Sequence, residues 1–86
     1  MRPLKILLEI LKDDIIDRHK TGNYIFMCNS LELLYRGTEI SKEELDLVFE
    51  HMEENKPNEF TINKSWFEPN DLKSRINWLN EQINKL

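Results

Sequence analysis

Two tryptophans, a phenylalanine and two basic residues near the C-terminal end are the residues best suited to bind a ligand. Trp66 and Phe67 are adjacent, and Lys64 stands two positions before them. Arg75 and Trp78 lie one turn apart on a predicted helix, where a guanidinium can stack on an indole. Aromatic rings stack on flat ligands, and basic groups pair with phosphate. The five residues therefore predict a binding patch for a nucleotide-like anion.

The same aromatic residues have a second interpretation that involves no ligand. Residues 55–69 form a predicted connection without regular structure, and connections of that length are uncommon in compact domains and often functional. Trp66 and Phe67 could anchor this connection onto the core, with Trp78 as a flanking lid, because aromatic residues contribute large buried areas. Both interpretations place Arg75 and Trp78 on the same side of the last helix, about a quarter turn from its apolar seam.

Acidic residues in one segment account for the whole net charge of −4. Residues 42–56 carry six acidic and two basic groups, whereas residues 1–41 carry six of each and residues 57–86 four of each. Proteins that bind duplex nucleic acid normally show a basic stripe, so we expect no such partner. The acidic segment is either a solvated helix face or a docking surface for a basic protein. The residues predicted to form this surface are Glu43, Asp46, Glu50 and Glu53.

Metal and catalytic sites are not predicted. His51 and Glu54 have helical i,i+3 spacing, but a bundle metal site needs further ligands. The stretch "LYRGTEISKEEL" is similar to the end of a calcium-binding loop, yet Leu33, Tyr35 and Gly37 occupy positions that need oxygen ligands. Cys28 lies in an apolar segment without an activating base, so an ordinary buried thiol is expected there. The sequence has no Ser/His/Asp arrangement, no acid pair with a distinctive spacing and no Gly-rich phosphate-binding loop. We therefore expect a protein that is not an enzyme and uses no cofactor.

The elements that position these residues are predicted to be three to four short helices. They form one all-α domain that spans residues 1–86. One long loop, anchored by its aromatic residues, is predicted before the C-terminal helix. A first helix over 3–20 follows from an apolar face with helical spacing. That face consists of Leu4, Leu7, Leu8, Leu11 and Ile15. Ile6 and Ile10 widen it by a quarter turn, so a second helix or a second subunit should cover them. We therefore expect a homo-oligomer.

The next two helices are predicted over residues 24–36 and from Ser41 to about residue 54. The first should be closed by Gly37, and the second opens with a capping box between Ser41 and Glu44. The alternative for the first is a short strand at residues 24–28 that pairs with residues 60–67, which would make the fold α+β.

The last helix is predicted to start near Asn70 or Asp71, because both are good capping residues. Its apolar residues alternate steps of four and three, as in a coiled-coil seam, although two repeats also suit a helix docked on its own core. The seam residues are Leu72, Ile76, Leu79, Ile83 and Leu86.

A cytoplasmic location is predicted from the N-terminal segment and the single cysteine. Lys5, Glu9 and Lys12 interrupt the apolar N-terminus, so it resembles neither a signal peptide nor a membrane span. Cys28 has no partner for an intrachain disulfide.

Several segments resemble a diffuse group of small uncharacterised proteins encoded by bacteriophages and prophages. The segments are "LLYRGTEISKEEL", "ENKP", "SWF" and "RINWLNEQI", within residues 24–86. Lys56 and Phe67 depart from the group, where arginine and a second tryptophan are expected. The resemblance implies an accessory or counter-defence protein in the host cytosol that acts by stoichiometric binding. Its partner would be a nucleotide-like immune signal or a host defence protein.

Overall fold

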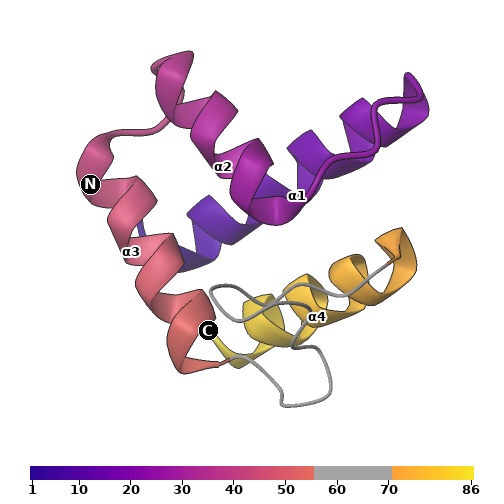
Figure 1. Ribbon diagram of the computed structural model, residues 1–86. Coiled ribbons are helices and arrows are strands. Elements are labelled where there is room, and N and C mark those ends of the chain that lie inside the picture. The colour runs from indigo at the N-terminus through magenta and orange to yellow at the C-terminus, as the bar shows by residue number, and fades with distance from the viewer. Residues whose placement is uncertain (56–70) are drawn as a thin grey trace.

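The protein folds into four helices in the computed structural model, which describes residues 1–55 and 71–86. They are α1 (Leu4–Lys20), α2 (Met27–Arg36), α3 (Lys42–Glu54) and α4 (Leu72–Lys85) (Figure 1). Every regular element in the described ranges is an α-helix, which confirms the all-α prediction. The predicted long connection lies outside the described residues, apart from Asn55, and so does the 60–67 half of the alternative hairpin.

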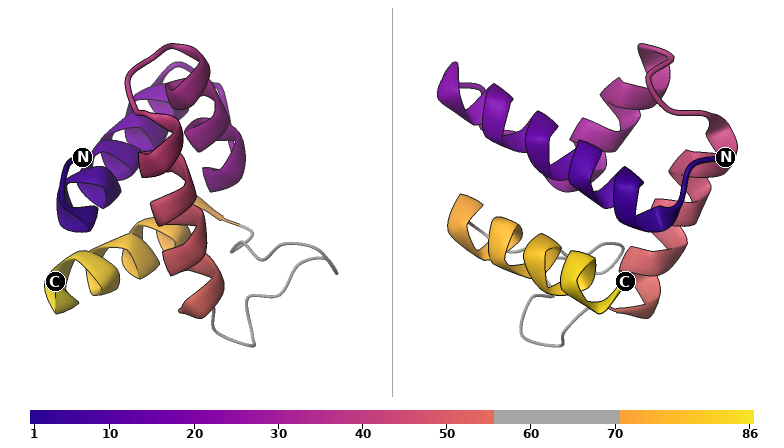
Figure 2. Two further views of the ribbon diagram at one scale, coloured as in Figure 1. Left: turned by 90° about the vertical axis from the view of Figure 1, so that its left-hand side faces the viewer. Right: turned by 180° about the vertical axis from the view of Figure 1, so that it is seen from behind.

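Helix α1 is the central element, and it packs against each of the other three helices. It runs antiparallel to α4, while α3 crosses one end of this pair (Figure 2). The predicted apolar face of α1 is confirmed, because the last four of its five members are at most 2% exposed and Leu4 is partly buried. Those four residues are Leu7, Leu8, Leu11 and Ile15. Each such burial contributes roughly 1.5–3 kcal/mol relative to an exposed side chain.

The stop after α1 is formed by a turn over Thr21, Gly22 and Asn23. Gly22 has a φ of +82°, a conformation that glycine adopts without a steric penalty. The N–H of Asn23 donates to the carbonyl of Arg18 at 2.9 Å, which satisfies one of the last carbonyls of the helix.

Helix α2 begins three residues later than predicted. Met27 is its first residue, and Phe26 is an extended N-cap with a φ of −75° and a ψ of 154°. The carbonyl of Ile25 accepts a hydrogen bond from Arg75, whereas a helix starting at residue 24 would direct this carbonyl along its own axis. The alternative strand at 24–28 is also wrong, because Met27 and Cys28 are helical.

The turn between α2 and α3 places a residue other than glycine in the left-handed region. Gly37 is the C-cap of α2, as expected, but it has a φ of −80°. The residue in the left-handed region is Thr38, with a φ of 60°. This conformation is unfavourable for a β-branched residue, so the turn stores strain at Thr38.

Helix α3 starts with the predicted capping box. The N–H of Glu44 donates to Ser41 Oγ at 3.1 Å, and the N–H of Ser41 donates to Glu44 Oε1 at 2.9 Å. Leu45, Val48 and Met52 on this helix are buried, while Phe49 is half-buried against the core.

The N-terminal segment is tied to this cap through Arg2. Its main-chain N–H and its Nε both donate to Glu44 Oε2, at 3.0 and 2.9 Å, and Nη2 donates to Oε1 at 3.1 Å. These bonds place the N-terminus beside the start of α3 (Figure 1). The Arg2 side chain, together with the N–H groups of Ser41 and Arg2, lowers the pKa of Glu44 far below its ordinary value.

Candidate functional site

The buried face of α4 coincides with the predicted seam only at Leu79. Arg75, Trp78, Leu79 and Gln82 are its buried residues. Seam residues Leu72, Ile76 and Ile83 are only partly buried, and Leu86 is 53% exposed. The helix is therefore rotated about its axis relative to the prediction. The side of α4 that carries Arg75 and Trp78 faces the core.

Trp78 is a core residue that connects α3 to α4. Its side chain is 2% exposed, and its Nε1–H donates to the carbonyl of Asn55 at 3.4 Å. The His51 ring lies 6.3 Å away between centroids, and His51 Nε2 is hydrogen-bonded to Gln82 Oε1 at 2.9 Å. These polar contacts explain how Gln82 is buried without loss of hydrogen bonding. An indole enclosed in this way presents no face on which a ligand could stack.

Arg75 is buried as well, at 5% exposure. Its Nη1 donates to the carbonyl of Ile25 at 3.2 Å, and its guanidinium carbon lies 4.6 Å from the centre of the Phe26 ring. The hydrogen bond fixes the extended segment before α2 against α4. The cation–π contact adds roughly 0.5–2 kcal/mol and orients the guanidinium.

The predicted ligand patch is thus separated into described and undescribed parts. Lys64, Trp66 and Phe67 lie outside the described residues, and Trp78 is enclosed in the core. Arg75 is the one predicted ligand contact that the described structure places at a surface cleft.

Tyr24, Phe26 and His19 line the cleft that contains Arg75, and the sequence analysis did not assign any of them to a site. The volume of this cleft is about 410 Å³. A sequence signal for it exists, because Tyr24 and Phe26 directly follow a helix stop. That signal was missed because residues 24–26 were assigned to a helix.

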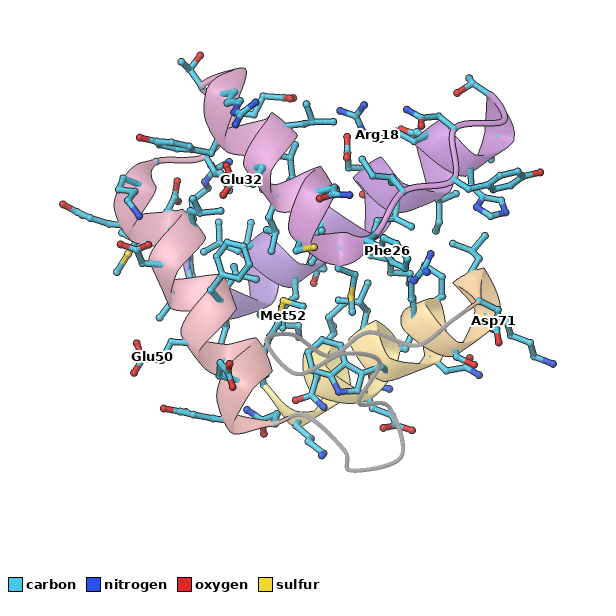
Figure 3. The ribbon with its side chains drawn as sticks, in the orientation of Figure 1. Arg18, Phe26, Glu32, Glu50, Met52 and Asp71 are labelled. Atoms are coloured by element: carbon cyan, nitrogen blue, oxygen red, sulfur yellow. The ribbon has the colours of Figure 1, made fainter. Side chains whose placement is uncertain are left out.

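The predicted acidic surface is exposed as a whole. Glu43, Asp46, Glu50 and Glu53 are all exposed on α3. Figure 3 shows Glu50 pointing away from the body of the protein, while Met52 on the same helix points into the core. We call these four residues the acidic face of α3.

Lysine neutralises one of these four carboxylates in the described part of the chain. Asp46 Oδ1 accepts a bond from Lys42 Nζ at 2.7 Å, one turn earlier on the same helix. Glu43 and Glu50 form no ion pair within residues 1–55 and 71–86. Glu44, by contrast, is buried on the inner side and satisfied by Arg2.

A metal site is absent from the part of the chain that the structure describes, where no three His, Cys, Asp or Glu side chains converge. His51, which was considered as a ligand, is bonded to Gln82 and contacts Asn55 Nδ2 at 3.2 Å. Nor does any helix in the described ranges have the length and apolar character needed to cross a membrane.

Comparison with known proteins found no family model, no curated protein and no solved structure that matches this chain.

Proposed function

We propose that this protein is a non-enzymatic binding protein that docks onto a basic surface of a partner protein through the acidic face of α3. The observation that carries the proposal is the exposure of Glu43, Asp46, Glu50 and Glu53 together on one helix. The segment that contains them is also the source of the net charge of −4.

The rigidity of α3 supports this use of the charges. The capping box fixes the start of the helix, and the buried Leu45, Val48 and Met52 hold it against the core. Glu43 and Glu50 are two turns apart on such a helix, or about 10.5 Å. Carboxylates at a fixed spacing can match basic groups without first losing conformational entropy, and this favours both fast association and specificity.

The resemblance to phage-encoded proteins suggests what the partner is. Within this proposal the protein acts in the host cytosol, and its partner is a host defence protein with a basic surface. Stoichiometric binding to such a surface would block it sterically and electrostatically. Sequestration of a nucleotide-like signal by the predicted aromatic patch has less support, because Trp78 is enclosed in the core.

Affinity capture from a host extract with charge-reversed variants tests the proposal. The double variant Glu43→Lys, Glu50→Lys changes the formal net charge from −4 to 0, two units for each substitution. We expect wild type to retain one basic protein in near-stoichiometric amount and this variant to lose it. Retention should also fall as salt is raised from 0.05 to about 0.5 M, because exposed charges are screened.

A matched control separates the acidic face from net charge. Asp13 and Asp17 are exposed acidic residues on α1, and Asp13→Lys, Asp17→Lys gives the same net charge of 0. This control should still retain the partner. Equal loss of the partner in both double variants, or retention in both, would overturn the proposal.

A further inference from the structure

A second cleft lies at the turn between α2 and α3, and we call it the turn cleft. Tyr35, Thr38 and Ile40 line it from the end of α2 and the turn, and Ser41 and Glu44 line it from the start of α3. Its volume is about 390 Å³. Figure 1 shows this turn beside the N-terminus, at the end of α3 where the acidic face begins. The turn cleft therefore opens next to the proposed docking surface.

Apolar surface is present in the turn cleft. Tyr35 carries a large aromatic ring and is 37% exposed, whereas Ile40 is 4% exposed and belongs to the core. An exposed ring next to a core residue offers a place where a further apolar side chain can be removed from water. Tyrosine is also one of the residues enriched at protein interfaces. The cleft therefore favours an apolar side chain as its occupant.

Thr38 lines the same cleft in a conformation that costs stability. Its φ of 60° lies in the left-handed region, which glycine occupies without a steric penalty. Strained residues of this kind cluster at binding and catalytic sites, where the surrounding structure holds them in place. A hydrogen bond from Thr38 Oγ1 to the Gly37 carbonyl, at 2.6 Å, fixes the side chain. The strained turn thus gives the cleft a wall that is formed before any partner binds.

The charges around the turn cleft favour a basic occupant. Arg2 lines the cleft, but its charge is matched by Glu44, because Nε lies 2.9 Å from Oε2 and Nη2 lies 3.1 Å from Oε1. Glu39 and Glu43 are exposed and form no ion pair within residues 1–55 and 71–86. In the part of the chain that the structure describes, two carboxylates therefore remain to attract cations beside the apolar surface.

We propose that the turn cleft receives an apolar side chain of the basic partner, from a segment in which lysine or arginine residues flank that side chain. The apolar side chain packs against Tyr35, and the flanking cations meet Glu39 and Glu43. Glu50 lies six residues beyond Glu44, or about 9 Å along α3, so cations two or three positions further along the segment reach the acidic face. The inference rests on the proposed docking function and adds the chemistry of the partner segment. Its charges steer association, and its apolar side chain slows release.

Two synthetic peptides of equal charge separate the apolar contact from the electrostatic one. The probe is Lys-Lys-Trp-Lys-Lys and the control is Lys-Lys-Ser-Lys-Lys, both with blocked termini. Each is titrated into the ¹⁵N-labelled protein in about 0.05 M salt and followed by NMR. We expect both peptides to shift amides of residues 43–50 and only the tryptophan peptide to shift those of residues 35 and 38–40. The tryptophan peptide should bind about fivefold or more tightly than the serine peptide. Equal affinity, or tryptophan-dependent shifts confined to residues 19 and 24–26, would overturn the proposal.

Two exposed tyrosines provide matched variants for these titrations. Tyr35→Ala removes a wall of the turn cleft, so it should weaken binding of the tryptophan peptide by about threefold or more and leave the serine peptide unaffected. Tyr24→Ala changes a tyrosine that is 73% exposed and does not line this cleft, so both affinities should be unchanged. Equal effects of the two substitutions on the tryptophan peptide would contradict the assignment.

The same titrations distinguish the turn cleft from the docking function on which it rests. The double variant Glu43→Lys, Glu50→Lys should lose affinity for both peptides. Shifts on α3 with equal affinity for the two peptides would overturn the apolar contact alone. The absence of shifts on α3 with either peptide would overturn the turn cleft and also contradict a basic partner for the acidic face.

Discussion

Replacement of Trp78 by alanine should remove a large fraction of the stability of this protein. The ring is 2% exposed and packs between α3 and α4, so the substitution leaves a cavity in the core. A buried Trp-to-Ala change costs about 3–5 kcal/mol. A domain of 86 residues has a total stability of roughly 4–13 kcal/mol at 0.05–0.15 kcal/mol per residue. We therefore expect the alanine variant to lose roughly a quarter or more of the free energy of unfolding.

Trp78→Phe provides a graded version of the same perturbation. Phenylalanine keeps most of the apolar contact but leaves the Asn55 carbonyl without the indole N–H. Because that hydrogen bond is long, at 3.4 Å, we expect a total cost of about 1–2 kcal/mol. If the ring is held mainly by core packing, Trp78→Ala should cost clearly more free energy of unfolding than Trp78→Phe. If it is held mainly by the hydrogen bond of its indole N–H, the two substitutions should cost about the same.

Urea denaturation followed by circular dichroism measures both losses in the free energy of unfolding. The slope of this free energy against urea concentration should be the same in all variants. Acrylamide quenching gives an independent readout in a Trp66→Phe protein, where Trp78 is the only remaining tryptophan. Its emission should be blue-shifted and weakly quenched. A cost below about 1 kcal/mol for Trp78→Ala, with emission like that of free tryptophan, would refute the core assignment and restore Trp78 as a surface residue.

Three further changes test local features of the fold by thermal and urea denaturation. Thr38→Gly should raise stability by about 1 kcal/mol, because Thr38 has a φ of 60° and glycine adopts this conformation without strain; a loss of stability would contradict this. Gly22→Ala should lower stability by about 1 kcal/mol for the same reason, although the added methyl group meets no atom within 4 Å. Glu44→Gln should destabilise the protein at pH 7 but progressively less in acid. The bonds from Arg2 lower the pKa of Glu44, so its stabilisation is complete above the ordinary value of 4.5 and is lost as the pH falls toward the folded-state pKa. A stability difference that is constant from pH 7 to pH 3 would contradict this.

Local signals in the sequence were sufficient to identify α1 with its buried face and α3 with its N-terminal cap. The spacing of leucines on α1 places four residues in the core, because a strongly periodic apolar face has only one way to be buried. The capping box at Ser41 likewise depends on neighbouring residues alone.

The orientation of α4 could not be predicted in this way. Apolar spacing favoured the seam, whereas burial of Arg75 and Gln82 depends on partners far away in the chain, the Ile25 carbonyl and His51. Once those partners satisfy the polar atoms, the large Trp78 ring decides which face of the helix is buried.

The start of α2 was misplaced for a related reason. Tyr24, Ile25 and Phe26 are aromatic or β-branched and suit either a helix or a strand in isolation. The bond from Arg75, fifty residues later, selects the extended conformation that opens the cleft beside Arg75. That cleft therefore depends on a long-range contact, while the acidic face follows from composition and helical spacing alone.

Site-specific photo-crosslinking tests the docking function most directly. A photoreactive amino acid replaces Glu50 in one protein and Asp17, on α1, in another, and each is irradiated in host extract. We expect position 50 to form a single major adduct with a basic protein and position 17 to form none. High salt during irradiation should abolish this adduct. An adduct of equal yield at both positions, or adducts only at position 17, would contradict the claim that the acidic face of α3 is the docking surface.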